Sequence, residues 1–226
     1  ANYHSVVKIF DFPLTGSVGY PSGQLVLAPN GYFYGYQHPE TPSKAAVFRI
    51  KPDGSDYLVV SSDINGRPSL SANLTYASNG FLYGTTQNGG SDGQGQLFRL
   101  SLTGTFEQLL SFTDATTRRS PSGILTEADG KLYGGVSGIN NSGIFRVDLN
   151  GTNFTNLYDL PTFSTDNFFR LVPGPDNAFY GKRNSFFRMG LDGSGFSEFP
   201  NGYDPASDYF TFGADLAAAT PYVFRL

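Results

Sequence analysis

The side chains best suited to chemistry are a few charged and aromatic residues that stand at comparable points of a recurring pattern. Arg170 and Asp215 each stand at the start of a short apolar segment, where an arginine could stabilise a developing oxyanion and a carboxylate could move a proton. His38 and Tyr209 lie in loops and are the other candidates for proton transfer. These four residues are the candidate catalytic set of a cofactor-free lyase, isomerase or cyclase.

A larger set of polar residues could bind a ligand without transforming it. Gln24 and Asn73 stand at the same point of the pattern as Arg170. The other candidates belong to long loops, where a rigid scaffold usually carries its binding residues: Tyr20, Arg67, Arg118, Arg119 and Arg183. The more ordinary interpretation of the two adjacent arginines is a solvated loop pair.

The residue types that are missing narrow the chemistry further. The chain has no cysteine, which excludes a thiolate site, and its only two histidines, His4 and His38, are too far apart in the sequence to indicate a zinc site. Asp63 and Asp92 lie in loops but lack the spacing of an EF-hand. No nucleophile elbow, zinc-protease, phosphate-loop or dinucleotide motif is present. We therefore expect neither a metal nor a cofactor.

The elements that carry these residues repeat along the chain. Four segments end in an aromatic-rich Tyr-Gly pair, at spacings of 49, 50 and 47 residues: YFYG at 32–35, FLYG at 81–84, KLYG at 131–134 and AFYG at 178–181. A Phe-Arg pair occurs five times, at 48–49, 98–99, 145–146, 187–188 and 224–225. We interpret both pairs as structural, with Phe packed between repeats and Arg covering it or pairing with a turn aspartate.

Each repeat predicts four short strands joined by tight turns. In the second repeat the strands are expected at 73–77, 81–86, 96–102 and 106–112, and Asn-Gly and Thr-Gly pairs supply the positive φ of short hairpins. Four strands in 40 to 50 residues are typical of a propeller blade. The predicted fold is therefore all-β, a single domain over 1–226 that forms a five-bladed β-propeller of four-stranded antiparallel blades.

The two ends of the chain are predicted to close the ring. The last repeat has a first strand at 215–220 and a third strand ending at 226, but no outer strand, whereas 5–12 matches the outer-strand pattern of 107–112. Pairing the N-terminal strand with the last blade would remove a free sheet edge. Because that blade lacks a Tyr-Gly strand, an open solenoid or a β-sandwich is the alternative fold.

The first strand of each repeat is predicted to line a central channel. Side chains alternate across a strand, so a repeated Leu occupies one face, while the other face ends in Ala or Gly, small enough for five strands to converge. The residue nearest the channel mouth differs in every repeat: Gln24, Asn73, Ile124, Arg170 and Asp215. A ring that varies around a constant core favours one ligand pocket at the mouth, with Asn73 buried.

The second repeat resembles a known family. Residues 82–112, LYGTTQNGGSDGQGQLFRLSLTGTFEQLLSF, resemble the GloVer tandem repeat in the LYGTT start, the glycine-rich loop, the Phe-containing strand and the final Ser-Phe. The other repeats keep only the LYG and FR cores. The resemblance implies an exported β-repeat protein, and it carries no catalytic residue across.

Charge and composition add expectations about partners and location. The net charge of −4, the pI of about 5.0 and the lack of a basic tract predict no nucleic-acid partner. No apolar run approaches the roughly 20 residues of a membrane span, so we expect no membrane insertion. The start at Ala1 is typical of a cleaved signal peptide, and sequons occur at Asn73, Asn140, Asn150 and Asn153. We expect a secreted protein that can carry glycans.

Three kinds of function remain open. The first is a lectin-like binding module for a small organic or carbohydrate ligand at the channel mouth, although the chain lacks Trp, the usual stacking surface for a sugar ring. The second is the cofactor-free enzyme, which the divergent mouth ring favours because a multivalent lectin would keep its pockets alike. The third is a structural or interaction role on the outer strands.

Overall fold

The computed structural model describes residues 8–12, 21–37, 44–66, 73–113, 120–136, 142–160, 170–182 and 186–199. Within these residues every regular element is a β-strand. The first sheet contains β1 (Pro21–Leu27), β2 (Phe33–Gln37), β3 (Lys44–Ile50) and β4 (Leu58–Asn65). The second contains β5 (Thr75–Tyr76), β6 (Leu82–Thr86), β7 (Gln96–Leu100) and β8 (Phe106–Ser111).

Two further sheets follow the same plan. The third contains β9 (Pro121–Ala128), β10 (Lys131–Val136), β11 (Gly143–Asp148) and β12 (Thr155–Asp159). The fourth contains β13 (Leu171–Pro173), β14 (Ala178–Lys182), β15 (Phe186–Gly190) and β16 (Ser197–Glu198). Within each sheet the strands pair antiparallel in chain order, which confirms the predicted four-stranded repeat.

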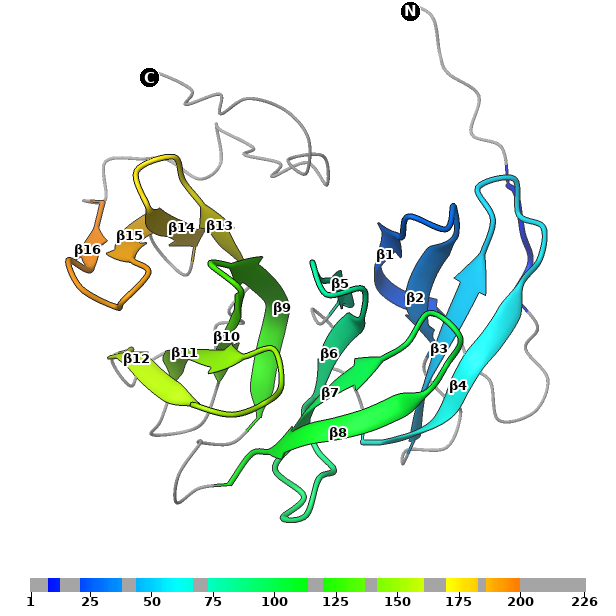
Figure 1. Cartoon of the computed structure of the whole chain (residues 1–226), viewed down its shortest axis with the longest axis horizontal. Helices are drawn as coiled ribbons and strands as arrows, with labels where there is room; N and C mark the ends of the chain where they lie inside the picture. The colour runs from blue at the N-terminus through cyan, green and yellow to red at the C-terminus, as the bar shows by residue number, and fades with distance from the viewer. Residues whose placement is uncertain are drawn as a thin grey trace, which may run out of the picture.

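The four sheets fan around an open centre (Figure 1). Their first strands β1, β5, β9 and β13 lie innermost and contact one another in that order, as in a propeller. The described residues form four sheets and an arc, not a closed ring of five. The last predicted repeat falls in 200–226, outside the described residues.

The two sequence motifs recur together because they are cross-strand partners. The glycine of each Tyr-Gly pair lies opposite the phenylalanine of a Phe-Arg pair: Gly35 and Phe48, Gly84 and Phe98, Gly134 and Phe145, Gly181 and Phe187. A Cβ on Gly134 would lie 2.7 Å from the Phe145 ring, so only glycine leaves room for it. All four phenylalanines are buried, which confirms their structural role.

The hydrophobic core is divided among the joints between sheets. One cluster joins the first sheet to the second and includes Tyr34, Val47 and Phe98. Two similar clusters join the second sheet to the third and the third to the fourth. Packing face to face in this way is what lets sheets with two apolar faces bury both of them.

One expectation about the first strands was wrong. By strand alternation, Thr75 and Thr126 share the predicted channel face with Asn73 and Ile124. However, Thr75 Oγ1 donates to the Leu125 carbonyl at 2.6 Å, and Thr126 Oγ1 donates to the Leu171 carbonyl at 2.6 Å. These side chains therefore connect each first strand to the next sheet. The physical reason is that a first strand is the inner edge of its sheet, so its two faces look toward neighbouring sheets.

The described part of the N-terminal segment, residues 8–12, forms no strand and packs on the first sheet. Phe10 stacks on Tyr57 with ring centroids 4.7 Å apart, and Phe12 meets Phe48 edge-on at 5.0 Å. The Ile9 carbonyl occupies the space where Gly54 would carry a Cβ. In the later repeats the corresponding turn glycines face outer-strand carbonyls of the preceding sheet: Val60, Leu109 and Leu157.

Candidate functional site

Three of the candidate site residues lie within the described structure: Gln24, Asn73 and Arg170. The others lie outside the described residues: Tyr20, His38, Arg67, Arg118, Arg119, Arg183, Tyr209 and Asp215. The expected pairing of Arg170 with Asp215, and the set of proton-transfer groups, therefore stay predictions.

Gln24 and Asn73 meet at the inner edge of the arc. The backbone N–H of Gln24 in β1 donates to Oδ1 of Asn73, which stands before β5. Asn73 is only 6% exposed, which confirms the predicted burial of its side chain. This contact ties the first strand of one sheet to that of the next and leaves the side chain of Gln24 exposed.

Arg170 holds the corresponding position before β13. Its backbone forms an isolated parallel bridge with Ile124 of β9, which fixes it at the inner edge. The side chain is half-buried, and its Nε is fully buried without a hydrogen-bond partner among the described residues. Burial lowers the pKa of the Arg170 guanidinium. A charged donor has therefore lost water here without gaining a protein acceptor in the described part of the chain.

The strands next to these residues begin with a distorted Pro-Ser-Gly sequence. Gly23 in β1 and Gly123 in β9 have φ of 76° and 80°, and the pairing register of each strand shifts beside them. The hydroxyls of Ser22 and Ser122 are buried and unpaired among the described residues. β-Bulges of this kind re-aim side chains and are common beside binding sites.

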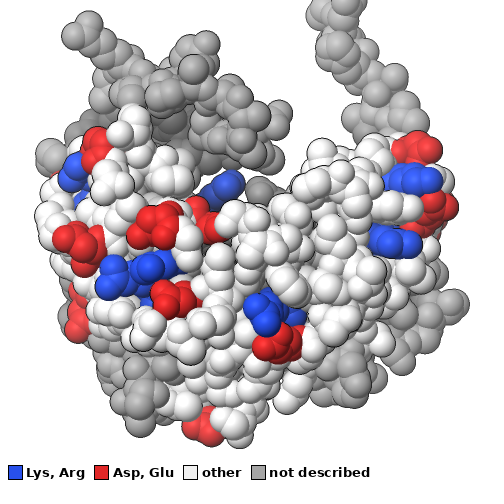
Figure 2. All heavy atoms as spheres, in the orientation of Figure 1, with Lys and Arg blue, Asp and Glu red and all other residues white. Residues whose placement is uncertain are grey.

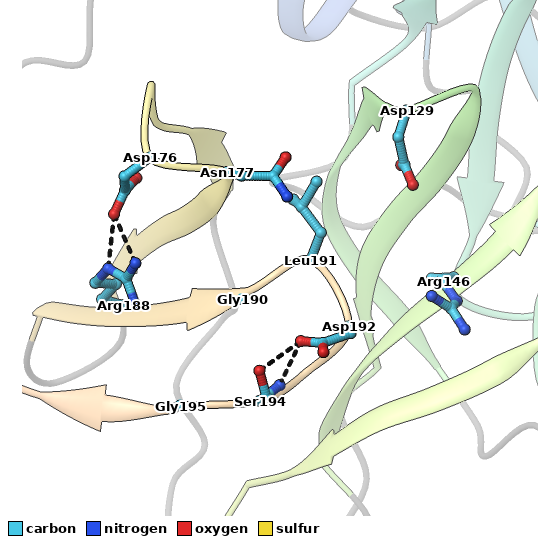
Figure 3. Close-up of a pocket in the computed structure, with 10 residues that line it drawn as sticks. All are labelled: Asp129, Arg146, Asp176, Asn177, Arg188, Gly190, Leu191, Asp192, Ser194 and Gly195. Atoms are coloured by element: carbon cyan, nitrogen blue, oxygen red, sulfur yellow. Dashed lines mark hydrogen bonds and ion pairs between the residues drawn. The ribbon is translucent and has the colours of Figure 1, made fainter.

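A second polar region lies between the third and fourth sheets. A hollow of about 500 Å³ is lined by the turns around Asp129, Asp176 and Asp192 and by Arg146 and Arg188 (Figure 3). Figure 2 shows acidic and basic side chains in mixed groups over these two sheets. This region was not predicted from the sequence, because the arginines of the Phe-Arg pairs were interpreted as structural.

Two of the charged groups around the hollow are held by short bonds. Arg188 donates to Oδ2 of Asp176 from Nε at 2.8 Å and from Nη2 at 2.7 Å, which confirms the predicted pairing with a turn aspartate. These bonds keep the pKa of Asp176 below its ordinary value. Asp192 accepts from Ser194 Oγ at 2.6 Å and from its N–H at 3.0 Å, and these bonds lower the pKa of Asp192. Both carboxylates are therefore charged at neutral pH.

Neither a metal cluster nor a membrane helix occurs in the described ranges. No group of three or more His, Cys, Asp or Glu residues there could hold a metal ion. The same residues include no helix of the length and apolar character needed to cross a membrane.

Comparison with known families identifies the repeat. The family model described as the Gloeobacter/Verrucomicrobia repeat matches residues 2–193. The chain belongs to the Gloeobacter/Verrucomicrobia repeat family. This confirms the resemblance of the second repeat and extends it over most of the chain. No curated protein sequence matches the chain.

Solved structures with similar folds are propeller-like. The chain is similar to a GH74 enzyme of Niastella koreensis (TM-score 0.55, 14% identity) and covers 30% of it with 82% of its own length. A gluconolactonase of Xanthomonas campestris superposes with a TM-score of 0.54 at 13% identity, and the chain covers 62% of it with 80% of its own length. The PQQ-bound aldose sugar dehydrogenase of Streptomyces coelicolor superposes with a TM-score of 0.54 at 15% identity, and the chain covers 69% of it with 81% of its own length. At these identities the likeness establishes the fold alone, and the chain spans less than two thirds of the first two proteins.

Proposed function

We propose that the protein binds a small polyhydroxylated ligand, of the carbohydrate class, at the inner ends of the first strands. The observation that carries the proposal is the Nε of Arg170, a buried charged donor with no acceptor among the described residues. Leaving such a donor unpaired costs about 1–3 kcal/mol or more, so native proteins keep few of them without a purpose. A ligand hydroxyl or carboxylate oxygen would supply the acceptor.

The surroundings of Arg170 support a built site. Ile124 fixes its backbone, and the glycine bulge at Gly123 sets the direction of the strand beside it. The unpaired hydroxyl of Ser122, which is 3% exposed, adds a second buried polar group on the same strand. A few polar groups in a mostly apolar setting are typical of small-molecule sites.

We also propose that the ring closes with five blades, as the N-terminal segment was expected to allow. The support is positional: the Ile9 carbonyl faces Gly54 as the Val60 carbonyl faces Gly104, so residues 8–12 lie where the outer strand of a preceding sheet would lie. The ring would bring the varied residues of the first strands together around one mouth. A C-terminal truncation after 199 would then lower the melting temperature.

We propose further that the protein is exported. Of its sequons, Asn150 and Asn153 are exposed on a turn of the third sheet, while Asn73 is buried. Expression through a eukaryotic secretory pathway should therefore glycosylate Asn150 or Asn153 and leave Asn73 unmodified, which peptide mass spectrometry can check.

Saturation-transfer NMR with neutral and acidic monosaccharides tests the binding proposal. The sugar-related names of two similar structures, the gluconolactonase and the aldose sugar dehydrogenase, motivate this choice of probe. We expect at least one sugar to receive saturation, and Arg170→Met to weaken its binding by about 10-fold or more, because a charge-assisted hydrogen bond is lost. The matched control is Arg99→Met, which removes an arginine far from the inner edge.

Stability separates a binding role from a structural one. Arg170→Met removes an unpaired buried donor, so it should leave the free energy of unfolding unchanged or raise it. Binding that persists in Arg170→Met, or no saturation of any sugar at millimolar concentration, would overturn the proposal.

A further inference from the structure

The arginines of the Phe-Arg pairs stand at equivalent positions in the four sheets but differ in their partners. In the first sheet the guanidinium of Arg49 lies over the ring of Tyr32, 4.6 Å from its centroid. In the second sheet Arg99 lies 4.7 Å from the centroid of Phe81, and its Nη2 is 2.7 Å from a carboxylate oxygen of Glu107. Both arginines are therefore covered.

Arg146, the equivalent residue of the third sheet, is not covered. It has neither an ion pair within 4 Å nor an aromatic ring over its guanidinium among the described residues. Its side chain hydrogen-bonds to the Tyr133 hydroxyl, and its charge acts on the carboxylates of Asp148 and Asp192. Arg188 of the fourth sheet, by contrast, is bound to Asp176. Figure 3 shows Arg146 at the edge of the hollow, with Asp129 above it and Asp192 to its left.

Two replacements distinguish the surroundings of Arg146 from those of Arg99. Lys131 stands where the second sheet has Phe81, and its Nζ is 3.5 Å from Oδ1 of Asp148. Thr155 lies opposite Arg146, at the place where Glu107 lies opposite Arg99. The third repeat therefore keeps the arginine and lacks the ring and the carboxylate that cover Arg99 in the second sheet.

The hollow also contains unused acceptors. Asp129 accepts from the Tyr133 hydroxyl at 2.8 Å with Oδ1 only, and Asp192 uses Oδ1 alone for Ser194. The second carboxylate oxygen of each has no hydrogen-bond partner among the described residues. Arg146 and these open acceptors therefore line one small hollow (Figure 3).

We propose that this hollow binds a small zwitterion with the chemistry of a free α-amino acid, its carboxylate on Arg146 and its ammonium group between Asp129 and Asp192. Guanidinium–carboxylate pairing is among the strongest charge-assisted contacts. The volume of about 500 Å³ lies within the range of small-molecule sites.

The charges of the hollow argue against other small ligands. Its walls carry two guanidinium groups and three carboxylates, so a simple anion would meet net negative charge. The described residues that line it include no aromatic side chain, so they offer no stacking surface for a sugar ring. A molecule with both charges satisfies Arg146 and the carboxylates at once.

Saturation-transfer NMR with an equimolar mixture of the twenty α-amino acids tests this site. We expect saturation of at least one amino acid, and at least about tenfold weaker binding of its deaminated and decarboxylated analogues, since each analogue loses one charge-assisted contact. No saturation of any amino acid at millimolar concentration would overturn the proposal, as would an analogue that binds equally well.

Variants locate the binding. Arg146→Gln and Asp192→Asn should each weaken binding by about tenfold or more, whereas the matched variant Arg99→Gln should not change it. Melting curves check that each variant is folded, and Asp192→Asn provides the test if Arg146→Gln is not. Unchanged binding in a folded Arg146→Gln would contradict the assignment. Arg170→Met should leave amino-acid binding intact, which keeps this test separate from the sugar proposal.

Discussion

Tyr83 and Tyr133 occupy the same position in consecutive repeats but have different partners. The Tyr83 hydroxyl donates to the Leu149 carbonyl of the next sheet at 2.7 Å, which joins the second sheet to the third. Tyr34 joins the first sheet to the second in the same way, through the Leu102 carbonyl at 3.0 Å. The Tyr133 hydroxyl donates instead to Asp129 of its own sheet, and the hollow lies beside it.

One turn residue accounts for this difference. Asn79 donates its amide to the Tyr83 oxygen at 2.8 Å, which leaves the hydroxyl proton of Tyr83 free for the next sheet. Asp129 stands at the equivalent position, and an ionised carboxylate can only accept. It therefore accepts the hydrogen bond of the Tyr133 hydroxyl, which would otherwise be available to join the third sheet to the fourth. A one-atom change in a turn can thus convert a sealed joint, in which a tyrosine hydroxyl bonds to the next sheet, into an open joint that lacks this bond.

The feature that all joints share should give the largest effect. Phe98→Ala removes a fully buried ring from the core between the first two sheets, and we expect a loss of about 3–5 kcal/mol in the free energy of unfolding. Phe145→Ala should cost a similar amount, because its ring fills the same space over Gly134. Urea unfolding measures both, and a loss below about 1 kcal/mol in either would mean that the joints do not share one packing rule.

The tyrosine hydroxyls should separate sealed from open joints. Tyr83→Phe leaves the Leu149 carbonyl without its donor inside a joint, at an expected cost of about 1–2 kcal/mol. Tyr133→Phe should cost less than half of that, because the exposed Asp129 carboxylate can bond to water instead. Equal losses in urea unfolding would show that both joints depend on their hydroxyl to the same degree.

Asp129→Asn should convert the open joint into a sealed one. The new amide can donate to the Tyr133 oxygen, so the hydroxyl proton of Tyr133 becomes available to the Leu191 carbonyl of the fourth sheet. We expect a gain of about 0.5–1 kcal/mol in stability and the loss of amino-acid binding. Asn79→Asp is the reciprocal control and should weaken the sealed joint. A destabilised Asp129→Asn protein that still binds would contradict this interpretation.

The smallest expected effect concerns pH. Hydrogen bonds from Arg188 hold the pKa of Asp176 below its ordinary value of 3.8. A lowered carboxylate pKa stabilises the folded state above that value, and the stabilisation is lost as the pH falls through the folded-state pKa. The melting temperature should therefore fall on acidification below about pH 4, and the melting temperature of the Asp176→Asn variant should fall less steeply. Parallel curves for the two proteins would show that the pair contributes nothing.

Much of the fold could be predicted from the sequence because its motifs have one physical cause. Tyr-Gly and Phe-Arg recur together because a phenylalanine ring needs a glycine opposite it. Turn glycines and strand alternation then give four strands per repeat. The face of Thr75 was predicted wrongly, because alternation says which residues share a face and not which neighbour that face meets.

The candidate site was less predictable. The position of Arg170 at an inner strand end followed from the repeat, but its unpaired Nε depends on packing between sheets. Arg146 was treated as one more structural arginine. The signal was present in Asp129 and Lys131, where the first two repeats have asparagine and an aromatic residue, but its meaning depends on partners in another sheet.

A crystal structure of the protein at a resolution that places the Tyr133 hydroxyl would test the difference between the joints most directly. The decisive quantities are the distances from the hydroxyl oxygens of Tyr83 and Tyr133 to the equivalent carbonyls, Leu149 and Leu191. We expect a hydrogen bond for Tyr83 and none for Tyr133, with Tyr133 bound to Asp129 and the hollow open to solvent. A direct hydrogen bond from Tyr133 to the Leu191 carbonyl, with the hollow closed, would contradict the proposed difference between the joints.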